Sequence, residues 1–336
     1  MCVRSHIFLI VAALFSFQVF PQKAVAQNER SSFSEWLDGV RAEALARGIR
    51  QEVLEEALGQ IDKPIVESIE RDREQPETVL SLEAYITSRV RASTVRTGRK
   101  MLQRHRALLE RVSKTYGVPA PVIVALWGIE SNFGRLTGAE PTVPVLTTLA
   151  WDPRRADFFR QELFDALDIL NRGDIELKQM RGSWAGAMGQ LQFMPSSYLE
   201  YAVDFDKDGR RDIWESPADI FASIANYLNK HGWVRGRRWG REVIVQRGRD
   251  IGVPRRDGAC QATRDMTVAL PLSEWQRLGV RLPRGRPLSQ ANFRASLFSG
   301  SSRSFLLYDN YDALLAYNCA HAYALSVALL ADRIAN

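Results

Sequence analysis

One carboxylate, Glu130, follows apolar residues at helical spacing and could act as a general acid. Ile123, Leu126 and Trp127 precede it by seven, four and three residues, so all four share one face of a predicted helix. A carboxylate among aliphatic and indole groups loses hydration, which favours its protonated form and raises its pKa. An acid that keeps its proton near neutral pH can donate it to a leaving group. The alternative is an ordinary glutamate at a helix end that reaches solvent.

A second segment, 182–198, is rich in glycine and alanine and carries two glutamines, Gln190 and Gln192. Small residues let a backbone come close to a ligand or to a neighbouring element. Glutamine side chains offer both a donor and an acceptor, as sugars with hydroxyl and acetamido groups require. Tight helix packing would explain the small residues equally well. The presence of the Glu130 segment in the same sequence therefore decides in favour of ligand binding.

Together, residues 125–134 and 182–198 closely resemble the signatures of the lytic murein transglycosylase B family, within the lysozyme-like superfamily. The resemblance runs from about Phe33 to the C-terminus, with later matches at Asn226-Tyr227 and Tyr317-Asn318. It implies an α+β fold that is predominantly α-helical. A lysozyme-like catalytic core would be joined by an N-terminal helical region and a small β-containing subdomain.

The resemblance also implies an enzyme, a peptidoglycan lytic transglycosylase, which is a carbon-oxygen lyase. It would cleave the MurNAc-β-1,4-GlcNAc bond and leave 1,6-anhydro-MurNAc ends. Glu130 would act first as acid and then as base, since neither signature holds a second acidic residue. The substrate's own 2-acetamido oxygen would replace the second carboxylate that ordinary glycosidases use. Two other interpretations stay open: a hydrolytic muramidase, and a non-catalytic murein-binding scaffold protein.

The family's substrate-binding residues can be carried over by position. They fall on Ser183, Met188, Gln192, Phe193, Tyr227, Tyr317, Asn318 and Tyr323. Arg154 and Arg155 match a basic pair that can meet a peptide or lactyl carboxylate. Ala320 replaces a small hydroxyl residue common in the family, which puts one hydrogen bond in doubt. For Phe193 and Trp184, packing in the core is at least as good an explanation as sugar contact.

Residues 204–215 match the twelve-residue calcium loop, with Gly209 at its turn position. Oxygen ligands at alternate positions can converge on one Ca²⁺, and several carboxylates need a cation to offset their repulsion. Calcium here would be structural, and catalysis would need no cofactor. The alternative is a hydrated acidic turn, stabilised by Arg210 and Arg211. The predicted ligands are Asp204, Asp206, Asp208, Arg210, Asp212 and either Glu215 or Asp219, because some family members place the last ligand later.

Residues 1–26 are predicted to be a cleavable signal peptide. Arg4 lies near the start, an apolar run covers 7–20, and Ala24-Val-Ala26 precedes Gln27. A membrane anchor is the alternative, but the run is short for a bilayer. Cys2 precedes the run, whereas a lipoprotein cysteine would follow it. We therefore expect a periplasmic protein that begins at Gln27 and has no stable membrane anchor.

Charge and composition limit the partners. Loss of Arg4 and Lys23 with the signal peptide would reduce the net charge from +6 to +4. This excess suits an anionic cell wall, but many secreted proteins share it. No run of like charge and no basic-aromatic pattern argues for nucleic acid. We expect a monomer that binds peptidoglycan glycan strands; whether it joins a cell-wall synthesis or division complex is left open.

Two cysteines, Cys260 and Cys319, remain after the signal peptide is removed. In an oxidising compartment an even pair predicts a disulfide, which would stabilise the fold by ~2–4 kcal/mol. Two unpaired, buried thiols are the alternative.

The elements that must position these residues are mostly helical. Breaks at Gly48, Gly59 and Lys63-Pro64 divide the early helices, and residues 71–76 look like the family's link to the catalytic core. Strand candidates are the segments 242–246, 267–270 and 304–308. The predicted units are an N-terminal helical region (27–109), a catalytic core (110–238) with the calcium-type loop (204–219), a β-rich subdomain (239–310) and a C-terminal helix returning to the core (311–336).

Overall fold

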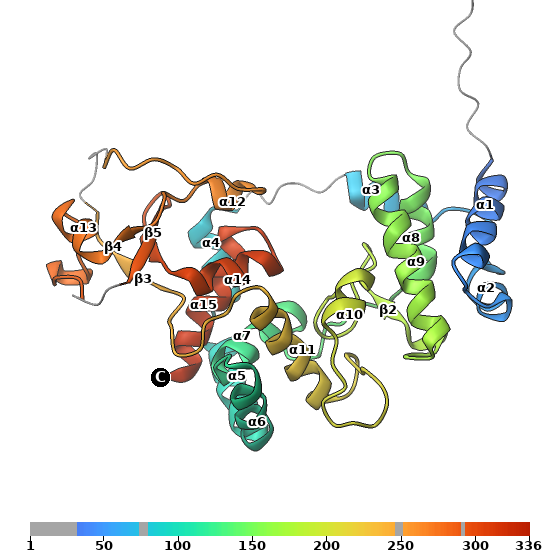
Figure 1. Ribbon diagram of the computed structural model, residues 1–336, viewed down its shortest axis with the longest axis horizontal. Coiled ribbons are helices and arrows are strands. Elements are labelled where there is room, and N and C mark those ends of the chain that lie inside the picture. Colours follow the sequence, from blue (N-terminus) through green and yellow to red (C-terminus); the bar gives the residue numbers. More distant parts are fainter. Residues whose placement is uncertain (1–31, 74–79, 246–250, 290–292) are drawn as a thin grey trace, which may run out of the picture.

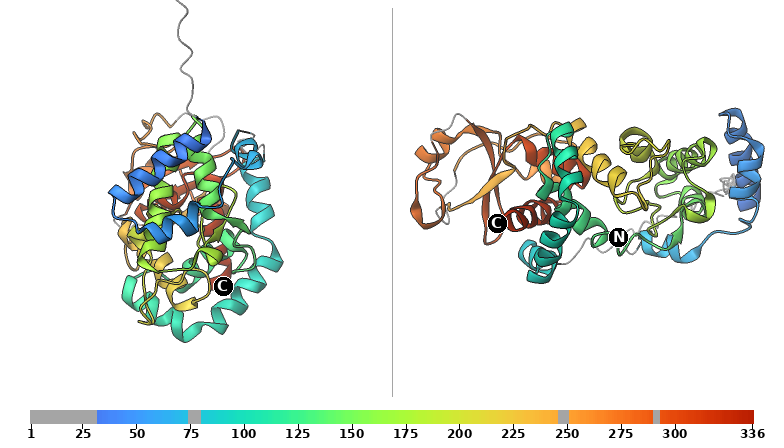
Figure 2. Two further views of the ribbon diagram at one scale, coloured as in Figure 1. Left: turned by 90° about the vertical axis from the view of Figure 1, so that its right-hand side faces the viewer. Right: turned by 90° about the horizontal axis from the view of Figure 1, so that it is seen from below.

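The computed structural model describes residues 32–73, 80–245, 251–289 and 293–336. Within these ranges the chain is mostly helical with small antiparallel sheets, which confirms the predicted fold class. Helices α1 and α2 lie at one end of the molecule and the β-containing subdomain lies at the other, with the remaining helices between them (Figure 1). The view from below in Figure 2 shows the same order. The predicted signal peptide, residues 74–76 of the predicted link and Gln246 lie outside the described residues.

The N-terminal region forms the short helices that its glycine and proline breaks predict. Ser32 caps the first helix, since its hydroxyl accepts from the Glu35 N–H and the Glu35 carboxylate accepts from the Ser32 N–H. The chain turns at Gly48, where φ is +89°. The helices are α1 (Phe33–Ala46), α2 (Gln51–Leu58), α3 (Val66–Arg73), α4 (Leu82–Arg89), α5 (Ala92–Arg104) and α6 (Arg106–Tyr116).

The helix α7 (Ala120–Ser131) runs through the middle of the core. Every residue from Val122 to Ser131 is buried except Glu130. The helix is therefore enclosed on all sides rather than on one face, because α15, α5, α11 and α6 all pack against it. The helices that complete the region are α8 (Thr142–Trp151), α9 (Ala156–Arg172), α10 (Pro195–Tyr201) and α11 (Pro217–Lys230).

Two very short strands join the segments that carry the two signatures. The strands β1 (Glu140–Pro141) and β2 (Arg181–Gly182) pair antiparallel, with Glu140 opposite Gly182. Just before β1, the backbone at Gly138 comes close to β2, since an added Cβ would lie 2.0 Å from the Gly182 carbonyl oxygen. The pair holds the second signature beside the chain that leaves α7.

A four-stranded antiparallel sheet forms the β-containing subdomain. Its strands are β3 (Gly240–Val243), β4 (Leu270–Pro271), β5 (Arg294–Ser299) and β6 (Ser304–Leu307), in the order β3-β6-β5-β4. Trp275 of α13 (Leu272–Arg277) is fully buried in a small core beneath the sheet. The prediction for 267–270 was largely wrong, because only Leu270 lies in a strand and Thr267 forms an isolated bridge. Strand β5 was not predicted, because it lacks a clear alternation of apolar and polar residues.

The single C-terminal helix predicted over 311–336 is a pair of helices. The chain bends by 118° between the helices α14 (Asp309–Tyr317) and α15 (His321–Ala335). Extended backbone at Asn318 and Ala320, with φ of −150° and −139°, interrupts a continuous apolar pattern. Helix α15 then packs against α7, α4 and α5, as the predicted return to the core requires. Over the described ranges, no single helix is both long and apolar enough to cross a membrane.

The predicted disulfide is present between Cys260 and Cys319, whose Cα atoms lie 6.4 Å apart. Cys260 immediately precedes α12 (Gln261–Arg264), and Cys319 lies in the break between α14 and α15. The bond therefore ties the β-containing subdomain to the turn between the last two helices.

Candidate active site

Glu130 lies in the last turn of α7, where its side chain is half-buried. The Tyr323 hydroxyl of α15 donates a short hydrogen bond to Oε1 of Glu130. Burial raises the pKa of Glu130 from its ordinary 4.5 to about 7, against opposing effects of the Tyr323 bond and the Arg89 charge. This environment matches the predicted one and gives a carboxyl group that can hold or release a proton near neutral pH.

The chain after Glu130 bends sharply into the second signature. Asn132, Phe133 and Gly134 have φ angles of +49°, +58° and +80°, a run of left-handed residues that ends the helix. The Ser131 hydroxyl stabilises this turn by accepting from the Gly134 N–H at 3.0 Å. Gly134 is needed for a second reason: an added Cβ would lie 2.3 Å from the Gln190 Oε1 atom.

Gln190 joins three segments that surround the site. Its Oε1 accepts from the Trp127 indole N–H at 2.7 Å, and its Nε2 donates to the Trp214 carbonyl oxygen at 2.6 Å. It therefore ties α7 to the segment that follows the acidic loop. The sequence placed Gln190 in the signature but assigned it no specific role, since a glutamine pattern does not distinguish a bridging side chain from a sugar-binding one.

Two side chains of the second signature, Ser183 and Gln192, present polar atoms at this site. The Ser183 hydroxyl accepts from the N–H groups of Ala185 and Ala187 at 3.3 and 3.2 Å. Gln192 has a φ of +54°, and its Nε2 donates to the carbonyl oxygens of Thr137 and Gly189 at 3.0 Å each. No donor to the Gln192 Oε1 atom is found among the described residues. That oxygen can accept a hydrogen bond from a ligand.

Four of the predicted aromatic residues form one cluster. The ring centroid of Tyr317 lies 5.8 Å from Phe193, 4.7 Å from Tyr227 and 6.4 Å from Tyr323. The break between α14 and α15 makes this possible, because it turns Tyr317 and Tyr323 toward the same place. Through Tyr323 the cluster reaches Glu130.

Most of this cluster is fixed by bonds within the protein. The Tyr227 hydroxyl donates to the Ala316 carbonyl oxygen at 2.8 Å, and the Tyr317 hydroxyl donates to that of Leu191 at 2.7 Å. Phe193 and Met188 are buried, at 2% and 0% exposed. These two side chains therefore support the site from the core, which was the alternative considered for Phe193.

The turn between α14 and α15 carries the remaining C-terminal candidate. Asn318 is exposed there, next to Tyr317. Ala320 is the N-cap residue of α15 and provides no side-chain cap. A serine or threonine hydroxyl at this position would accept from a free helix N–H. Ala320 therefore lacks the hydrogen bond that a serine or threonine would make to a backbone N–H in the first turn of α15.

The basic pair lies apart from this cluster, after the end of α8. Arg154 Nε donates to the Asp72 carboxylate at 2.8 Å, and Arg155 lies 3.3 Å from its other oxygen. Asp72, on α3, is 3% exposed. Arg154 and Arg155 therefore tie α3 to the chain before α9, and neither contacts Glu130. Their role toward a substrate carboxylate stays a prediction.

Helix α4 contributes residues that the sequence did not single out. Arg89 lies near enough to Glu130 to lower its pKa, and Tyr85 lies near enough to Tyr323 to add to the rise in pKa that burial causes there. The Arg89 guanidinium carbon lies 5.3 Å from the Tyr85 ring centroid. These residues precede the first signature by about forty positions, and no motif marks them. Only the packing of α4 on α15 brings them to the site.

The acidic loop brings four carboxylates together. One carboxylate oxygen from each of Asp204, Asp206, Asp208 and Asp219 lies within 4.8 Å of the others. Asp219 is buried, and burial together with the nearby charges of Asp206 and Asp204 raises its pKa to about 6, although hydrogen bonds from two backbone N–H groups oppose the rise. Crowded oxygens in this arrangement suit a hard divalent cation.

The other predicted ligands of the loop lie outside that group. The Asp212 carboxylate accepts from the N–H groups of Trp214 and Glu215 at 2.9 Å each, and the Glu215 side chain is exposed. The Arg210 side chain lies 3.6 Å from the Asp208 carboxylate. Between the two candidates for the closing ligand, the geometry favours Asp219 over Glu215.

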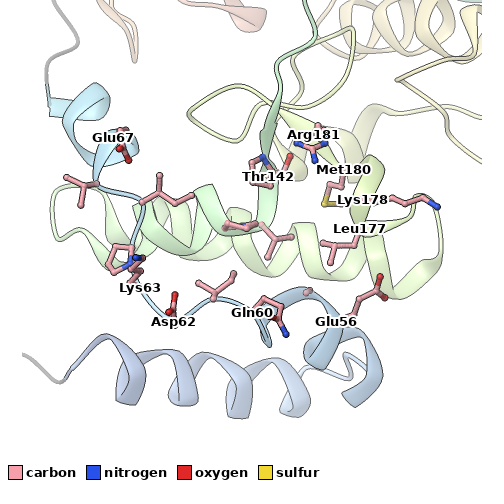
Figure 3. A pocket seen from close by; sticks show the side chains of 18 residues that line it. Glu56, Gln60, Asp62, Lys63, Glu67, Thr142, Leu177, Lys178, Met180 and Arg181 are labelled. Carbon is pink, nitrogen blue, oxygen red and sulfur yellow. The ribbon is translucent and has the colours of Figure 1, made fainter.

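Two larger cavities in the described part of the chain do not include Glu130 in their linings. One, of about 700 Å³, is enclosed by the chain between α2 and α3 and by the start of α8, with Thr142 and Met180 on its wall (Figure 3). The other, of about 460 Å³, is lined by Thr137 and Gly138 and, across from them, by Trp214 and Glu215 of the acidic loop segment. Because the Thr137 carbonyl oxygen binds Gln192, the acidic loop shares a cavity wall with the candidate site.

The burial of Glu130 predicts a stability change that depends on pH. Above pH 7 the folded protein must hold a charged carboxylate where a neutral one is favoured, because the folded pKa is about 7 against an ordinary 4.5. Stability therefore falls as pH rises from 4.5 to 7. We expect Glu130→Gln to raise the free energy of unfolding at pH 8 by up to about 3 kcal/mol, and to change it little at pH 4. Urea unfolding at both pH values checks this, and an equal difference at both would contradict it.

A family model and a known relative both compare this chain with transglycosylases. Residues 32–332 match the family described as the transglycosylase SLT domain. Membrane-bound lytic murein transglycosylase B of Escherichia coli strain K12 is 41% identical over 147 residues, which cover 44% of this chain and 40% of that protein.

Solved structures extend the similarity to nearly the whole chain. SltB3 from Pseudomonas aeruginosa, crystallised in complex with NAG-anhNAM-pentapeptide, is 40% identical with a TM-score of 0.84, over 91% of this chain and 80% of that one. The lytic transglycosylase Slt35 of Escherichia coli, crystallised in complex with calcium, is 28% identical with a TM-score of 0.73, over 95% and 98% of the two chains.

Proposed function

The chain belongs to the transglycosylase SLT domain family, and we propose that it is a lytic transglycosylase of peptidoglycan. It would cleave the MurNAc-β-1,4-GlcNAc bond and release 1,6-anhydro-MurNAc ends. The observation that carries this proposal is Glu130, a single half-buried carboxyl group with a pKa of about 7. The Tyr323 hydroxyl, which donates to Oε1, orients it.

In the first step, protonated Glu130 donates its proton to the glycosidic oxygen as the bond from that oxygen to C1 of MurNAc breaks. The 2-acetamido oxygen of the same sugar stabilises the positive charge that develops at C1. Because Tyr323 holds Oε1, Oε2 is the oxygen that carries the proton toward the substrate. Burial supports this step, since it keeps the proton on Glu130 at near-neutral pH.

In the second step, the Glu130 carboxylate accepts the proton of the C6 hydroxyl while the C6 oxygen bonds to C1. Glu130 returns to its protonated form, and no water is consumed. The Tyr323 bond and the Arg89 charge both favour the carboxylate, so they stabilise the form of Glu130 that the first step leaves behind and that acts in the second. Intramolecular attack is fast because the nucleophile is already held near C1.

Among the described residues no second carboxylate influences the pKa of Glu130, which favours this route over direct displacement. Retaining glycosidases set two carboxyl groups about 5 Å apart, and inverting ones set them about 6.5–9.5 Å apart. Among the described residues, no other acidic side chain contacts Glu130 or shifts its pKa. The buried carboxylate of Glu162 is engaged elsewhere, since it accepts from the N–H and the hydroxyl of Ser196 at the start of α10.

The residues around Glu130 supply a sugar-binding surface. The free Oε1 atom of Gln192 and the hydroxyl of Ser183 would meet the hydroxyl and acetamido groups of the glycan. Tyr317 and Tyr323 have nearly parallel rings, at 13°, that can pack against sugar rings. Asn318 is exposed beside them and would donate from its amide. SltB3, which shares 40% identity with this chain, was crystallised with NAG-NAM-pentapeptide, and a glycan with a stem peptide is the substrate class we propose here.

We propose that the acidic loop binds one structural Ca²⁺. The ligands would be Asp204, Asp206, Asp208 and Asp219, whose oxygens already converge, with the Arg210 backbone carbonyl at loop position 7. Bound calcium would offset the repulsion among these carboxylates and hold the loop against the cavity that it shares with Thr137. Slt35, which is 28% identical, was crystallised in complex with calcium.

The proposed substrate places the protein in the periplasm. The predicted signal peptide would direct it there, and we keep the expectation that no stable membrane anchor remains after cleavage. The Escherichia coli relative is named as membrane-bound, so detergent-free extraction of the native protein is the direct check of that expectation.

Digestion of purified murein sacculi tests the proposed activity. Mass spectrometry of the released muropeptides should find anhydro-MurNAc ends, which are lighter by one water than hydrolytic products. Reducing ends in their place would make the protein a muramidase. No release at all, with binding to sacculi intact, would favour the scaffold protein.

A further inference from the structure

A basic cavity of about 280 Å³ lies in the β-containing subdomain, away from Glu130. The chain before β3, the start of β5 and the start of α14 enclose it. Its lining is arginine-rich and holds a single carboxylate: the residues are Gly236, Arg237, Arg238, Arg241, Phe293, Arg294, Tyr308 and Asp309. Four guanidinium groups beside one carboxylate give the cavity lining a net positive charge.

Three of the four arginines have partners inside the protein. Arg237 pairs with Asp309 at 2.7 Å, and Arg238 pairs with Asp332 at 3.2 Å. Arg294 donates to the Ala269 carbonyl oxygen at 2.5 Å. For Arg241, no carboxylate lies within ion-pair distance anywhere in the described ranges.

Two buried polar atoms in this cavity also lack a partner. Among the described residues the Tyr308 hydroxyl donates to no acceptor, although Tyr308 is only 8% exposed. The Nε atom of Arg241, a partly exposed residue, is also buried and has no acceptor among the described residues. The two side chains are neighbours, since the Arg241 guanidinium carbon lies 5.6 Å from the Tyr308 ring centroid. Buried polar groups normally have partners, so two unpaired donors on one cavity wall indicate an absent acceptor.

We propose that this cavity binds a carboxylate group, with the Arg241 guanidinium and the Tyr308 hydroxyl as its donors. One free guanidinium matches the single charge of a carboxylate, and its planar fork fits the two oxygens. A phosphate dianion would meet the Asp309 carboxylate on the same wall. The apolar rings of Phe293 and Tyr308 would contact the carbon atoms next to the bound group.

The stem peptide of peptidoglycan is the ligand that we assign, and this choice of ligand rests on the proposed function. Its carboxylates lie on a flexible chain, and the end of such a chain can enter a cavity of about 280 Å³. The cavity belongs to the β-containing subdomain, whereas Glu130 belongs to α7. Binding here would hold a neighbouring stem while the glycan is cut at Glu130.

Binding of a free stem pentapeptide to the full-length mature protein tests the proposal by titration calorimetry. Arg241→Gln should weaken binding about tenfold or more, because it removes a charged donor. Tyr308→Phe should weaken it less, about threefold to tenfold, with little change in packing. Arg277→Gln is the matched control, since its side chain is 71% exposed on the same subdomain and pairs with Glu274. Its binding should stay within about twofold of the wild type.

A peptide with its carboxylates converted to amides should lose binding to the wild type, and Arg241→Gln should cause little further loss. Equal weakening by Arg241→Gln and Arg277→Gln would show a net-charge effect and would overturn the proposal. The proposal would also be overturned if the wild-type protein bound no peptide. It would be overturned as well if Arg241→Gln weakened binding to phosphatidylglycerol vesicles but not to the peptide. Thermal unfolding of each variant checks that it is folded.

The test is separate from that of the proposed activity. Cleavage of peptide-free glycan strands reports on Glu130 and should be unchanged by Arg241→Gln. Peptide binding without glycan cleavage would leave the cavity assigned and the lytic activity refuted.

Discussion

Glu130→Gln should lower the rate of anhydromuropeptide release by about a thousandfold or more. Glutamine keeps the shape of the side chain and can still accept from Tyr323, but it has no proton to donate and cannot serve as base. General acid-base groups contribute about 10²–10⁴-fold each, and Glu130 would act in both steps. Initial rates on purified sacculi, measured by quantitative mass spectrometry, check the prediction.

The matched control is Glu110→Gln on α6. Glu110 forms an exposed pair with Arg106 at 2.8 Å, so its loss removes a carboxylate of the same kind without touching the site. Binding of Glu130→Gln to sacculi should match that of the wild type, because the sugar contacts are unchanged. If Glu130→Gln turned over at the wild-type rate, Glu130 would not be the acid.

Asp219→Ala should cause a large loss of stability and of calcium binding. The Asp219 carboxylate accepts from the N–H groups of Phe205 and Asp212 at 2.7 and 2.8 Å, so it joins both ends of the acidic loop to α11. Alanine would leave both partly buried donors unpaired, at a cost of up to about 1–3 kcal/mol each. It would also remove a proposed metal ligand. Urea unfolding with and without calcium checks the prediction.

The comparison with Glu215→Ala decides which residue closes the metal site. Calcium should stabilise the wild type and Glu215→Ala to similar extents, since a ligand that binds only the folded state shifts unfolding by mass action. It should stabilise Asp219→Ala little or not at all. The reverse pattern would assign the closing position to Glu215. A wild type that calcium does not stabilise would leave the loop as a hydrated acidic turn.

Local patterns in the sequence were enough to predict much of the fold. The breaks at Gly48, Gly59 and Pro64 separate real helices, because glycine and proline act through the backbone itself. The presence of small β-structure in a mostly helical chain was predicted, but strand β5 was missed. The prediction of a single C-terminal helix was wrong. The apolar pattern of α14 and α15 continues through the turn between them, and the disulfide at Cys319 lies in that turn.

The sequence by itself predicted the disulfide between Cys260 and Cys319, which is present, and singled out Glu130, the second signature and the acidic loop as candidates. Each depends on residue types at short spacings, or on there being only two cysteines beyond the predicted signal peptide, so no knowledge of distant contacts was needed. The bond from Tyr323 to Glu130, the bridge made by Gln190 and the nearness of Arg89 came only from the tertiary structure. The same holds for Asp219 as the residue that completes the acidic group, and for the unpaired Arg241 and Tyr308. These features join side chains that are far apart in the chain, and burial decides their charge and their partners. Only the packing of whole helices and strands determines which groups lose water together, and a local pattern does not contain that information.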